Sequence, residues 1–93
     1  MDQEIKQGAT MFYIGTCEEQ AKAYLRWSEQ PDRILKAEST FTDPSMRGMG
    51  VASRLFEAFV DYARKGGYKI IPACSYVAAR MDQEPENYGD LKA

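Results

Sequence analysis

The sequence predicts an α/β (α+β) fold with a mixed sheet: antiparallel N-terminal strands, a central helix, a parallel strand and a short C-terminal helix. Three observations carry this prediction. Residue types alternate with period two through residues 20–42, apolar residues recur every three or four positions in residues 51–65, and a short apolar run follows at residues 68–74. Because a helix separates the last two strands, these strands are expected to be parallel and joined by a right-handed crossover.

The composition is that of a globular protein, with 93 residues, 44% of them hydrophobic and 28% charged, and a net charge of −2. It predicts one domain spanning residues 1–93. The weakly acidic balance argues against a nucleic-acid partner. No apolar run could span a membrane and the N-terminus lacks an apolar signal region, so we expect a cytoplasmic protein without a membrane partner. The oligomeric state stays open.

The absence of histidine restricts the chemistry. It excludes the Ser-His-Asp and Cys-His classes of hydrolase. The two cysteines, Cys17 and Cys74, are far apart in the sequence and form no C-x-x-C pair. We therefore expect no metal site.

The first half of the chain predicts three strands. Residues 5–14 are typical of extended chain interrupted at Gly8, and the segment from Met11 to Ile14 is the best strand within it. Residues 20–28 alternate with period two, which favours a strand over the short helix that their Ala and Lys content would also allow. A turn at residues 29–32 leads into the third strand.

The third strand is predicted over residues 33–42 and ends at Asp43-Pro44. Strict alternation gives it two faces. One face carries Leu35, Ala37, Ser39 and Phe41, and the other carries Ile34, Lys36, Glu38, Thr40 and Thr42.

A long amphipathic helix follows, and it ends at Gly66-Gly67, where a left-handed cap is expected. Its apolar stripe consists of Val51, Ala52, Leu55, Phe56, Phe59, Val60 and Ala63. Residues 68–74 then predict a buried strand whose pairing is broken at Pro72, which cannot donate a hydrogen bond. Ser75 is expected to cap a short helix from Tyr76 to about Met81, and residues 82–93 to form a polar surface tail.

The turn before the long helix is the chemical feature of the sequence. Gly48 and Gly50 allow a ligand to approach the backbone, and the first-turn N–H groups with the helix dipole favour an anion such as phosphate. Arg47 adds a positive charge beside them. From these residues alone, a turn that binds nothing is an equal alternative. The spacing fits neither a P-loop nor a dinucleotide-binding fingerprint.

The segment Arg47-Gly48-Met49-Gly50-Val51-Ala52 resembles the R/Q-x-x-G-x-G/A acetyl-CoA signature of the GCN5-related N-acetyltransferases (GNAT). The segment from Pro72 to Val77 resembles the P-x-C-[PS]-[FY] mark of the minimal, single-domain branch of that family. The resemblance extends from about Glu4 to Leu91. It departs from the branch at Ser39-Thr40, where a His-Thr pair is usual, and this removes the obvious catalytic base.

The resemblance implies acetyl-CoA, and hence coenzyme A, as cosubstrate. Its pyrophosphate would bind the N–H groups of Arg47, Gly48, Met49, Gly50, Val51 and Ala52. The pantetheine arm would enter a gap between the third strand, ending at Phe41-Thr42, and the strand ending at Ala73-Cys74. The thioester would then lie between Ser39 and Cys74, with N–H groups near Phe41 and Thr42 as donors to an oxyanion.

The catalytic candidates are Cys74, Ser39 and Tyr76. Cys74 has three interpretations: a residue lining the thioester pocket, a nucleophile that carries the acetyl group, or a small core residue. Tyr76 is a candidate donor to the leaving thiolate, although a tyrosine here could simply pack. Glu38 is a possible base, but strict alternation places it on the face opposite Ser39.

These expectations favour an acetyl-CoA-dependent N-acetyltransferase in which an unidentified amine attacks the thioester directly. One alternative is a CoA-binding module with little transferase activity, and another is acyl transfer through Cys74. A small interaction protein whose glycine turn binds nothing is a further alternative.

Overall fold

The computed structural model describes residues 4–93, and residues 1–3 of the predicted domain lie outside the described residues. The strands are β1 (Lys6–Gln7), β2 (Met11–Gly15), β3 (Ala21–Gln30), β4 (Ile34–Thr42) and β5 (Lys69–Pro72). The α-helices are α1 (Val51–Gly66), α2 (Ser75–Gln83) and α3 (Pro85–Tyr88), and short 3-10 turns are η1 (Glu18–Gln20), η2 (Pro44–Met46) and η3 (Gly89–Leu91). The predicted mixed α and β architecture is confirmed.

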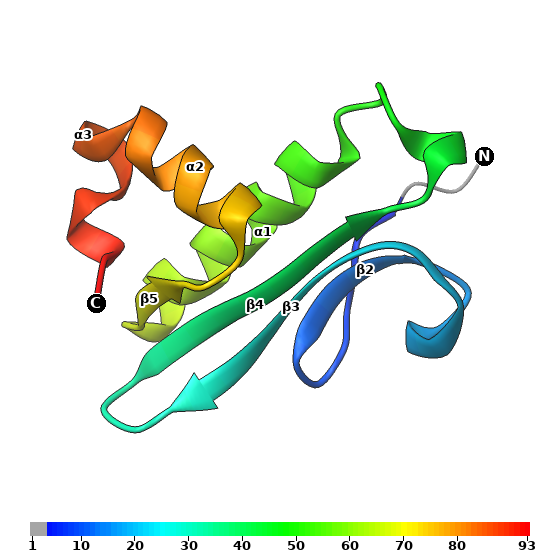
Figure 1. Ribbon diagram of the computed structural model, residues 1–93. Coiled ribbons are helices and arrows are strands. Elements are labelled where there is room, and N and C mark those ends of the chain that lie inside the picture. Colours follow the sequence, from blue (N-terminus) through cyan, green and yellow to red (C-terminus); the bar gives the residue numbers. More distant parts are fainter. Residues whose placement is uncertain (1–3) are drawn as a thin grey trace.

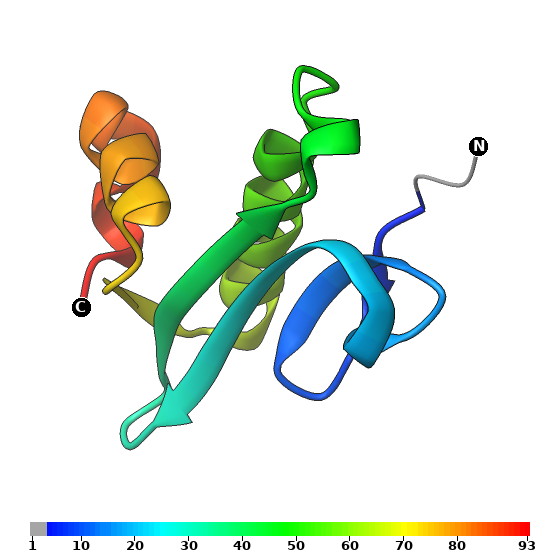
Figure 2. The same cartoon turned by 45° about the vertical axis from the view of Figure 1, so that its right-hand side comes forward.

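The strands form one sheet in the order β1-β2-β3-β4-β5. The first four strands pair antiparallel, and β5 pairs parallel to β4, as the intervening helix predicted. Helix α1 lies along one face of the sheet, while α2 and α3 sit beside the β5 edge (Figures 1 and 2). In the part of the chain that the structure describes, no helix covers the opposite face of β2, β3 and β4, which we call the open face (Figure 2).

The core lies between the sheet and α1. Alternation along β3 buries Ala23, Leu25 and Trp27, and the Trp27 ring lies 5.4 Å from the Phe59 ring of α1. The predicted apolar stripe of α1 is buried except for Ala52, which is half-buried. Each fully buried side chain of Leu or Phe size contributes roughly 1.5–3 kcal/mol. Gly67 takes the predicted left-handed cap, with φ 70° and ψ 30°.

A β-bulge in β4 changes the predicted face assignment. Arg26 of β3 pairs with Ser39, but the next residue, Trp27, pairs with Ala37, so Glu38 is an extra residue in β4. One added residue inverts the side-chain alternation beyond it. The faces predicted from strict alternation are therefore correct up to Ala37 and wrong after it.

Beyond the bulge, the threonines of β4 lie on the helix side. Thr40 pairs with the buried Leu25, and Thr42 pairs with the buried Ala23. Phe41 pairs with Tyr24 on the open face, where their rings are 5.5 Å apart. Ser39 and Phe41 thus share the open face, and Thr40 and Thr42 face α1.

The ends of the chain also differ from prediction. The predicted extended segment of residues 5–14 forms the hairpin β1–β2, which Gly8 N closes by donating to Met11 O at 2.7 Å. The predicted surface tail instead packs on the core, because Tyr88 and Leu91 lie three residues apart and are both buried. Ser75 begins α2 and makes no side-chain cap.

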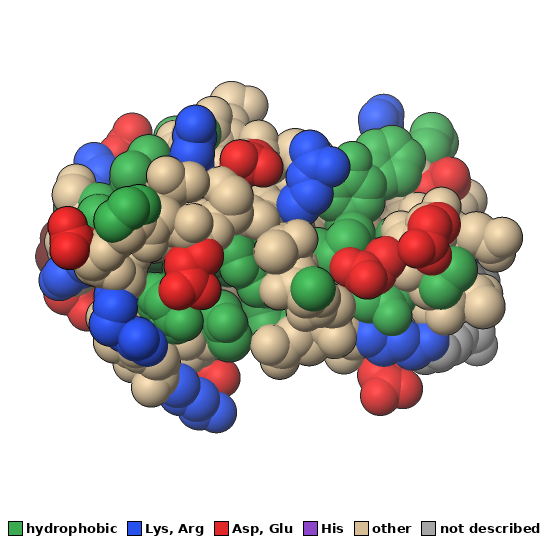
Figure 3. All heavy atoms as spheres, turned by 90° about the horizontal axis from the view of Figure 1, so that it is seen from below, with side chains coloured by type: hydrophobic (Ala, Val, Ile, Leu, Met, Phe, Trp, Pro, Cys, Tyr) green, Lys and Arg blue, Asp and Glu red, His purple; other side chains and the backbone are tan. Residues whose placement is uncertain are grey.

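The surface carries both signs of charge. On the face seen from below in Figure 3, acidic and basic side chains are interspersed among hydrophobic ones. This face therefore presents no broad field of a single sign.

Candidate functional site

The turn between β4 and α1 is held at its base by two residues. Asp43 accepts hydrogen bonds from Ser45 N at 2.9 Å and Ser45 Oγ at 2.7 Å, and these bonds hold the pKa of Asp43 below its usual value. Met46 is buried in the core. The chain that follows, from Arg47 to Gly50, is exposed, so the turn projects from a fixed base.

Both glycines of the turn have left-handed backbone, with φ 84° at Gly48 and 72° at Gly50. A Cβ placed on either glycine would meet no atom within 4 Å, so the space above them is open. Glycine is needed at both positions because any other residue in the left-handed conformation costs roughly 1–2 kcal/mol. The open backbone surface is also what a ligand would approach.

The start of α1 presents unpaired N–H groups. The first helical hydrogen bond runs from Arg54 N to Gly50 O at 3.1 Å, so the amides of Val51, Ala52 and Ser53 have no acceptor within the helix. Such a terminus favours an anion. Within the turn, Arg47 N donates to Pro44 O and Met49 N to Met46 O, at 3.3 and 3.4 Å. These two amides of the predicted cradle are engaged by the protein itself.

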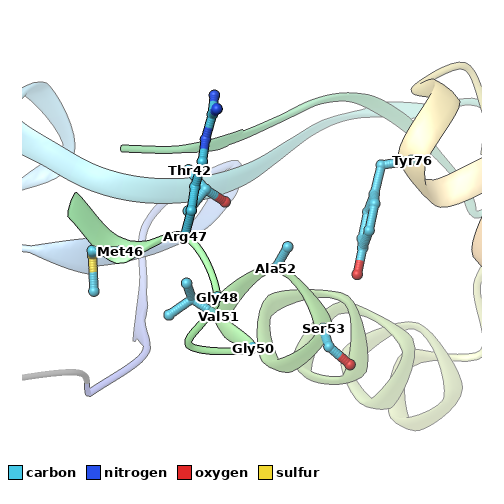
Figure 4. Close-up of a pocket in the computed structure, with 9 residues that line it drawn as sticks. All are labelled: Thr42, Met46, Arg47, Gly48, Gly50, Val51, Ala52, Ser53 and Tyr76. Atoms are coloured by element: carbon cyan, nitrogen blue, oxygen red, sulfur yellow. The ribbon is translucent and has the colours of Figure 1, made fainter. Parts of the chain in front are cut away.

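A cavity of about 360 Å³ opens at this turn (Figure 4). It is lined by Thr42, Met46, Arg47, Gly48, Gly50, Val51, Ala52, Ser53 and Tyr76. Tyr76 reaches into it from α2 on the side opposite the turn, and the Arg47 side chain extends past Thr42 (Figure 4). The structure thus brings most of the predicted coenzyme residues together with Tyr76, while Met49 stays at the exposed tip of the turn.

Strands β4 and β5 separate close to this cavity. Their pairing runs from Ile34 and Lys69 to Ala37 and Pro72, and Cys74 N makes a last bond to Ala37 O at 2.8 Å. Beyond it, β4 continues to Thr42 without pairing to β5. The break predicted at Pro72 is confirmed.

The amides along this free edge of β4 can be assigned from the pairing. Asp43 N donates to Lys22 O at 2.7 Å, and hydrogen-bonded pairs alternate along an antiparallel ladder. Phe41 therefore bonds to β3, whereas the N–H groups of Thr40 and Thr42 point toward the gap. Of the two residues predicted as oxyanion donors, Thr42 directs its N–H group toward the gap, whereas Phe41 directs its N–H group toward β3.

Cys74 lies at the closed end of the gap. It is the N-cap residue of α2, is 8% exposed, and its Sγ is 3.2 Å from Thr40 Oγ1. Ser39, expected beside it, is instead on the open face, with a buried Oγ that has no hydrogen-bond partner among the described residues. Sequence reasoning missed Thr40 because the bulge determines which of the two hydroxyls meets the sulfur.

The open face also holds Glu38. Its carboxylate accepts a hydrogen bond from Ser28 Oγ at 2.9 Å and lies 4.0 Å from Arg26 Nε. Arg26 is the cross-strand partner of Ser39, so Glu38 and Ser39 share a face. The expectation that alternation would separate these two residues is wrong, and the bulge is the reason.

Arg80 of α2, which the sequence reasoning missed, hydrogen-bonds two residues that line the cavity. Its Nη1 donates to Ser53 Oγ at 2.9 Å and to Tyr76 Oη at 3.0 Å, and its guanidinium lies 4.7 Å above the Phe56 ring. Burial alone would lower the pKa of Arg80, but its interactions with Tyr76, Tyr88 and Glu57 raise it. The four-residue spacing from Tyr76 on one helix face was the available sequence signal.

Comparisons with known proteins agree with this geometry. Residues 11–91 match the family model of the GCN5-related N-acetyltransferases. The chain is 33% identical to a protein from Staphylococcus aureus described as a "GCN5-like putative N-acetyltransferase", whose solution structure was determined by NMR; the TM-score is 0.76. The similarity covers 98% of this chain and 88% of that one. Among proteins with curated descriptions, none matches.

Residues 4–93 offer neither a membrane-spanning helix nor a metal-binding cluster. No helix there has both the length and the apolar character needed to cross a bilayer. No cluster of three or more His, Cys, Asp or Glu side chains there could hold a metal ion.

Proposed function

The chain belongs to the GCN5-related N-acetyltransferase family, and from this premise we propose that it transfers the acetyl group of acetyl-CoA to an amine. One observation carries the proposal. The unpaired amides at the start of α1 line the same cavity as Arg47 and Tyr76, close to the point where β4 and β5 separate. An anion site next to an open strand edge suits a ligand with phosphates at one end and a flexible amide-containing arm.

The pyrophosphate of the coenzyme would bind the N–H groups of Gly48, Gly50, Val51 and Ala52, with the exposed Arg47 supplying a positive charge. Each favourable charge–dipole contact at an exposed helix start contributes roughly 0.3–1 kcal/mol. The amides of the pantetheine arm would pair with the free edge of β4, in place of the missing β5 residues. This arrangement directs the thioester toward Thr40 and Cys74.

The acceptor amine would approach from the open face of the sheet, and Glu38 is its candidate base. The amine nitrogen attacks the thioester carbonyl, Glu38 receives the proton, and the N–H of Thr42 hydrogen-bonds the oxyanion. The C–S bond then breaks, and Tyr76 is the candidate proton donor to the thiolate. Ser39 lies beside Glu38, but its Oγ is buried and is not accessible to an incoming amine.

We propose direct attack, with Cys74 as a residue that lines the thioester pocket. A second route, acyl transfer through Cys74, is favoured by one observation, the contact of 3.2 Å between its sulfur and Thr40 Oγ1. Intact-protein mass after incubation with acetyl-CoA alone separates the two routes. Direct attack predicts no acetyl adduct on the peptide that contains Cys74, and a covalent route predicts a stoichiometric one.

The proposal is tested by calorimetric titration with acetyl-CoA, followed by thiol release in the presence of a panel of amines. Binding together with amine-dependent thiol release supports the transferase. Binding with no release for any amine would support the alternative, a CoA-binding module. No binding would contradict the proposed function.

A further inference from the structure

Arg80 stands behind the wall of the coenzyme cavity rather than inside it. It lies on α2, one turn beyond Tyr76, and it bridges to Ser53 in the first turn of α1. Both Ser53 and Tyr76 line the cavity, whereas Arg80 does not. The guanidinium is held on its far side by Glu57, 3.4 Å from Nη2, and by the Phe56 ring beneath it.

The chemistry of these contacts fixes the direction of the hydrogen bonds. A guanidinium only donates, so the oxygens of Ser53 and Tyr76 must both accept from Nη1. Each hydroxyl then has its own hydrogen left to donate elsewhere. A charge-assisted bond to the oxygen also polarises the O–H group and strengthens the bond it donates.

On the side of Arg80 away from the cavity, Glu57 already has hydrogen-bond partners. Glu57 Oε1 accepts from Tyr88 Oη at 3.0 Å as well as lying near Arg80. The side chain of Arg80 is only 19% exposed, so its position is set by packing as well as by charge. Because Ser53 and Tyr76 line the cavity, their remaining O–H hydrogens are available for donation into it.

We propose that Arg80 is a positioning residue that sets the hydroxyls of Ser53 and Tyr76 as paired hydrogen-bond donors into the cavity. This inference rests on the proposed function, because the group that it recognises is the acceptor-rich part of coenzyme A, its phosphate or carbonyl oxygens. The unpaired amides at the start of α1 and the two hydroxyls then offer donors from two walls of one cavity. Recognition on this side depends on a cation that does not itself touch the ligand.

The test is a mutant cycle measured as CoA affinity by calorimetry. Arg80→Met keeps a long stem over Phe56 but removes the donor, and should weaken CoA binding about tenfold, the scale of one hydrogen bond to a charged group. Ser53→Ala with Tyr76→Phe should weaken it similarly. Adding Arg80→Met to that double variant should cause no further loss, because Arg80 acts only through the two hydroxyls. Arg80→Lys, which still donates, should recover part of the affinity.

A matched control is Arg64→Met. Arg64 also ties α1 to the C-terminal segment, through Asn87 and Asp90, but it lies away from the cavity. Its CoA affinity should be unchanged, and thermal unfolding of all variants reports whether the fold is kept. A purely structural role for Arg80 predicts instead that its loss weakens CoA binding equally with and without the two hydroxyls. That result would overturn this inference and leave the proposed function unaffected. Failure of the unsubstituted protein to bind CoA would overturn the proposed function and this inference with it.

Discussion

The two faces of β4 beyond its bulge differ in what they present. The helix side offers Thr40 and Thr42, beside a buried cysteine and the cavity at the start of α1. The open face offers Glu38, Ser39 and Phe41, and no helix within residues 4–93 covers them. The helix side of β4 is thus shielded, whereas the open face is accessible to an acceptor amine that reaches the thioester at the free edge of β4.

The bulge at Glu38 creates this division. If β4 paired with β3 without a bulge, strict alternation would place Ser39 on the helix side, toward the sulfur of Cys74, and Glu38 on the opposite face. If the division is correct, substitutions on the open face should slow transfer without changing coenzyme affinity, and substitutions at the start of α1 should do the reverse. The predictions below test that separation.

The largest effect is expected on the open face. Glu38→Gln keeps the size of the side chain but removes the base, and should lower kcat about 100-fold, the lower range for general base catalysis. The dissociation constant of CoA should stay unchanged, because Glu38 lies across the strand from the cavity. Steady-state thiol release and calorimetry measure the two quantities. An unaffected kcat would remove Glu38 from the mechanism.

The coenzyme side should show the opposite pattern. Arg47→Ala should weaken CoA binding by about 1–3 kcal/mol, the range for losing a hydrogen bond to a charged group. The rate at saturating acetyl-CoA should remain close to that of the unsubstituted protein. Calorimetry against CoA and against pantetheine, which carries no phosphate, shows whether the loss of affinity depends on the phosphates. Equal losses for both ligands would place Arg47 outside the phosphate site.

A substitution in the glycine turn should weaken CoA binding by a similar or smaller amount than Arg47→Ala. Gly50→Val places a β-branched residue at φ 72°, which costs roughly 1–2 kcal/mol in the turn and covers amides at the start of α1. A loss of this size corresponds to a fall in CoA affinity of about tenfold. Gly89→Val is a suitable comparison, since Gly89 has φ −60° and does not line the cavity. Equal CoA affinity in both variants would argue against binding at the turn.

The smallest effect is expected at Cys74, which touches the helix side of β4. Cys74→Ala removes one sulfur from a nearly buried position and should change kcat by no more than about threefold if the residue only lines the pocket. The same variant should keep its CoA affinity. Loss of transfer in Cys74→Ala, together with an acetyl adduct on the unsubstituted protein, would support the covalent route.

Local features of the site were predictable from the sequence. Gly48 and Gly50 determine the turn through their own backbone, and the apolar spacing of residues 51–65 determines the buried side of α1. The break at Pro72 follows from its missing N–H group. Each of these depends on residues close together in the chain.

Features that depend on distant pairing were not predictable in the same way. The position of Thr40 against Cys74 depends on how β3 and β4 align, and no residue type near Glu38 indicates a bulge. The role of Arg80 depends on α2 packing beside α1, and the burial of Tyr88 and Leu91 depends on the core that they cover. The polar composition of residues 82–93 pointed to the surface because it does not reveal that two apolar side chains there share a face.

The central claim is that the coenzyme occupies the free edge of β4 and the start of α1. Two-dimensional NMR of the isotope-labelled protein, titrated with CoA, tests it most directly. The claim predicts that the largest amide shifts occur at Gly48, Gly50, Val51 and Ala52, with further shifts at Thr40 and Thr42 along the free edge of β4. Saturable shifts that leave these amides unchanged and cluster elsewhere would contradict it.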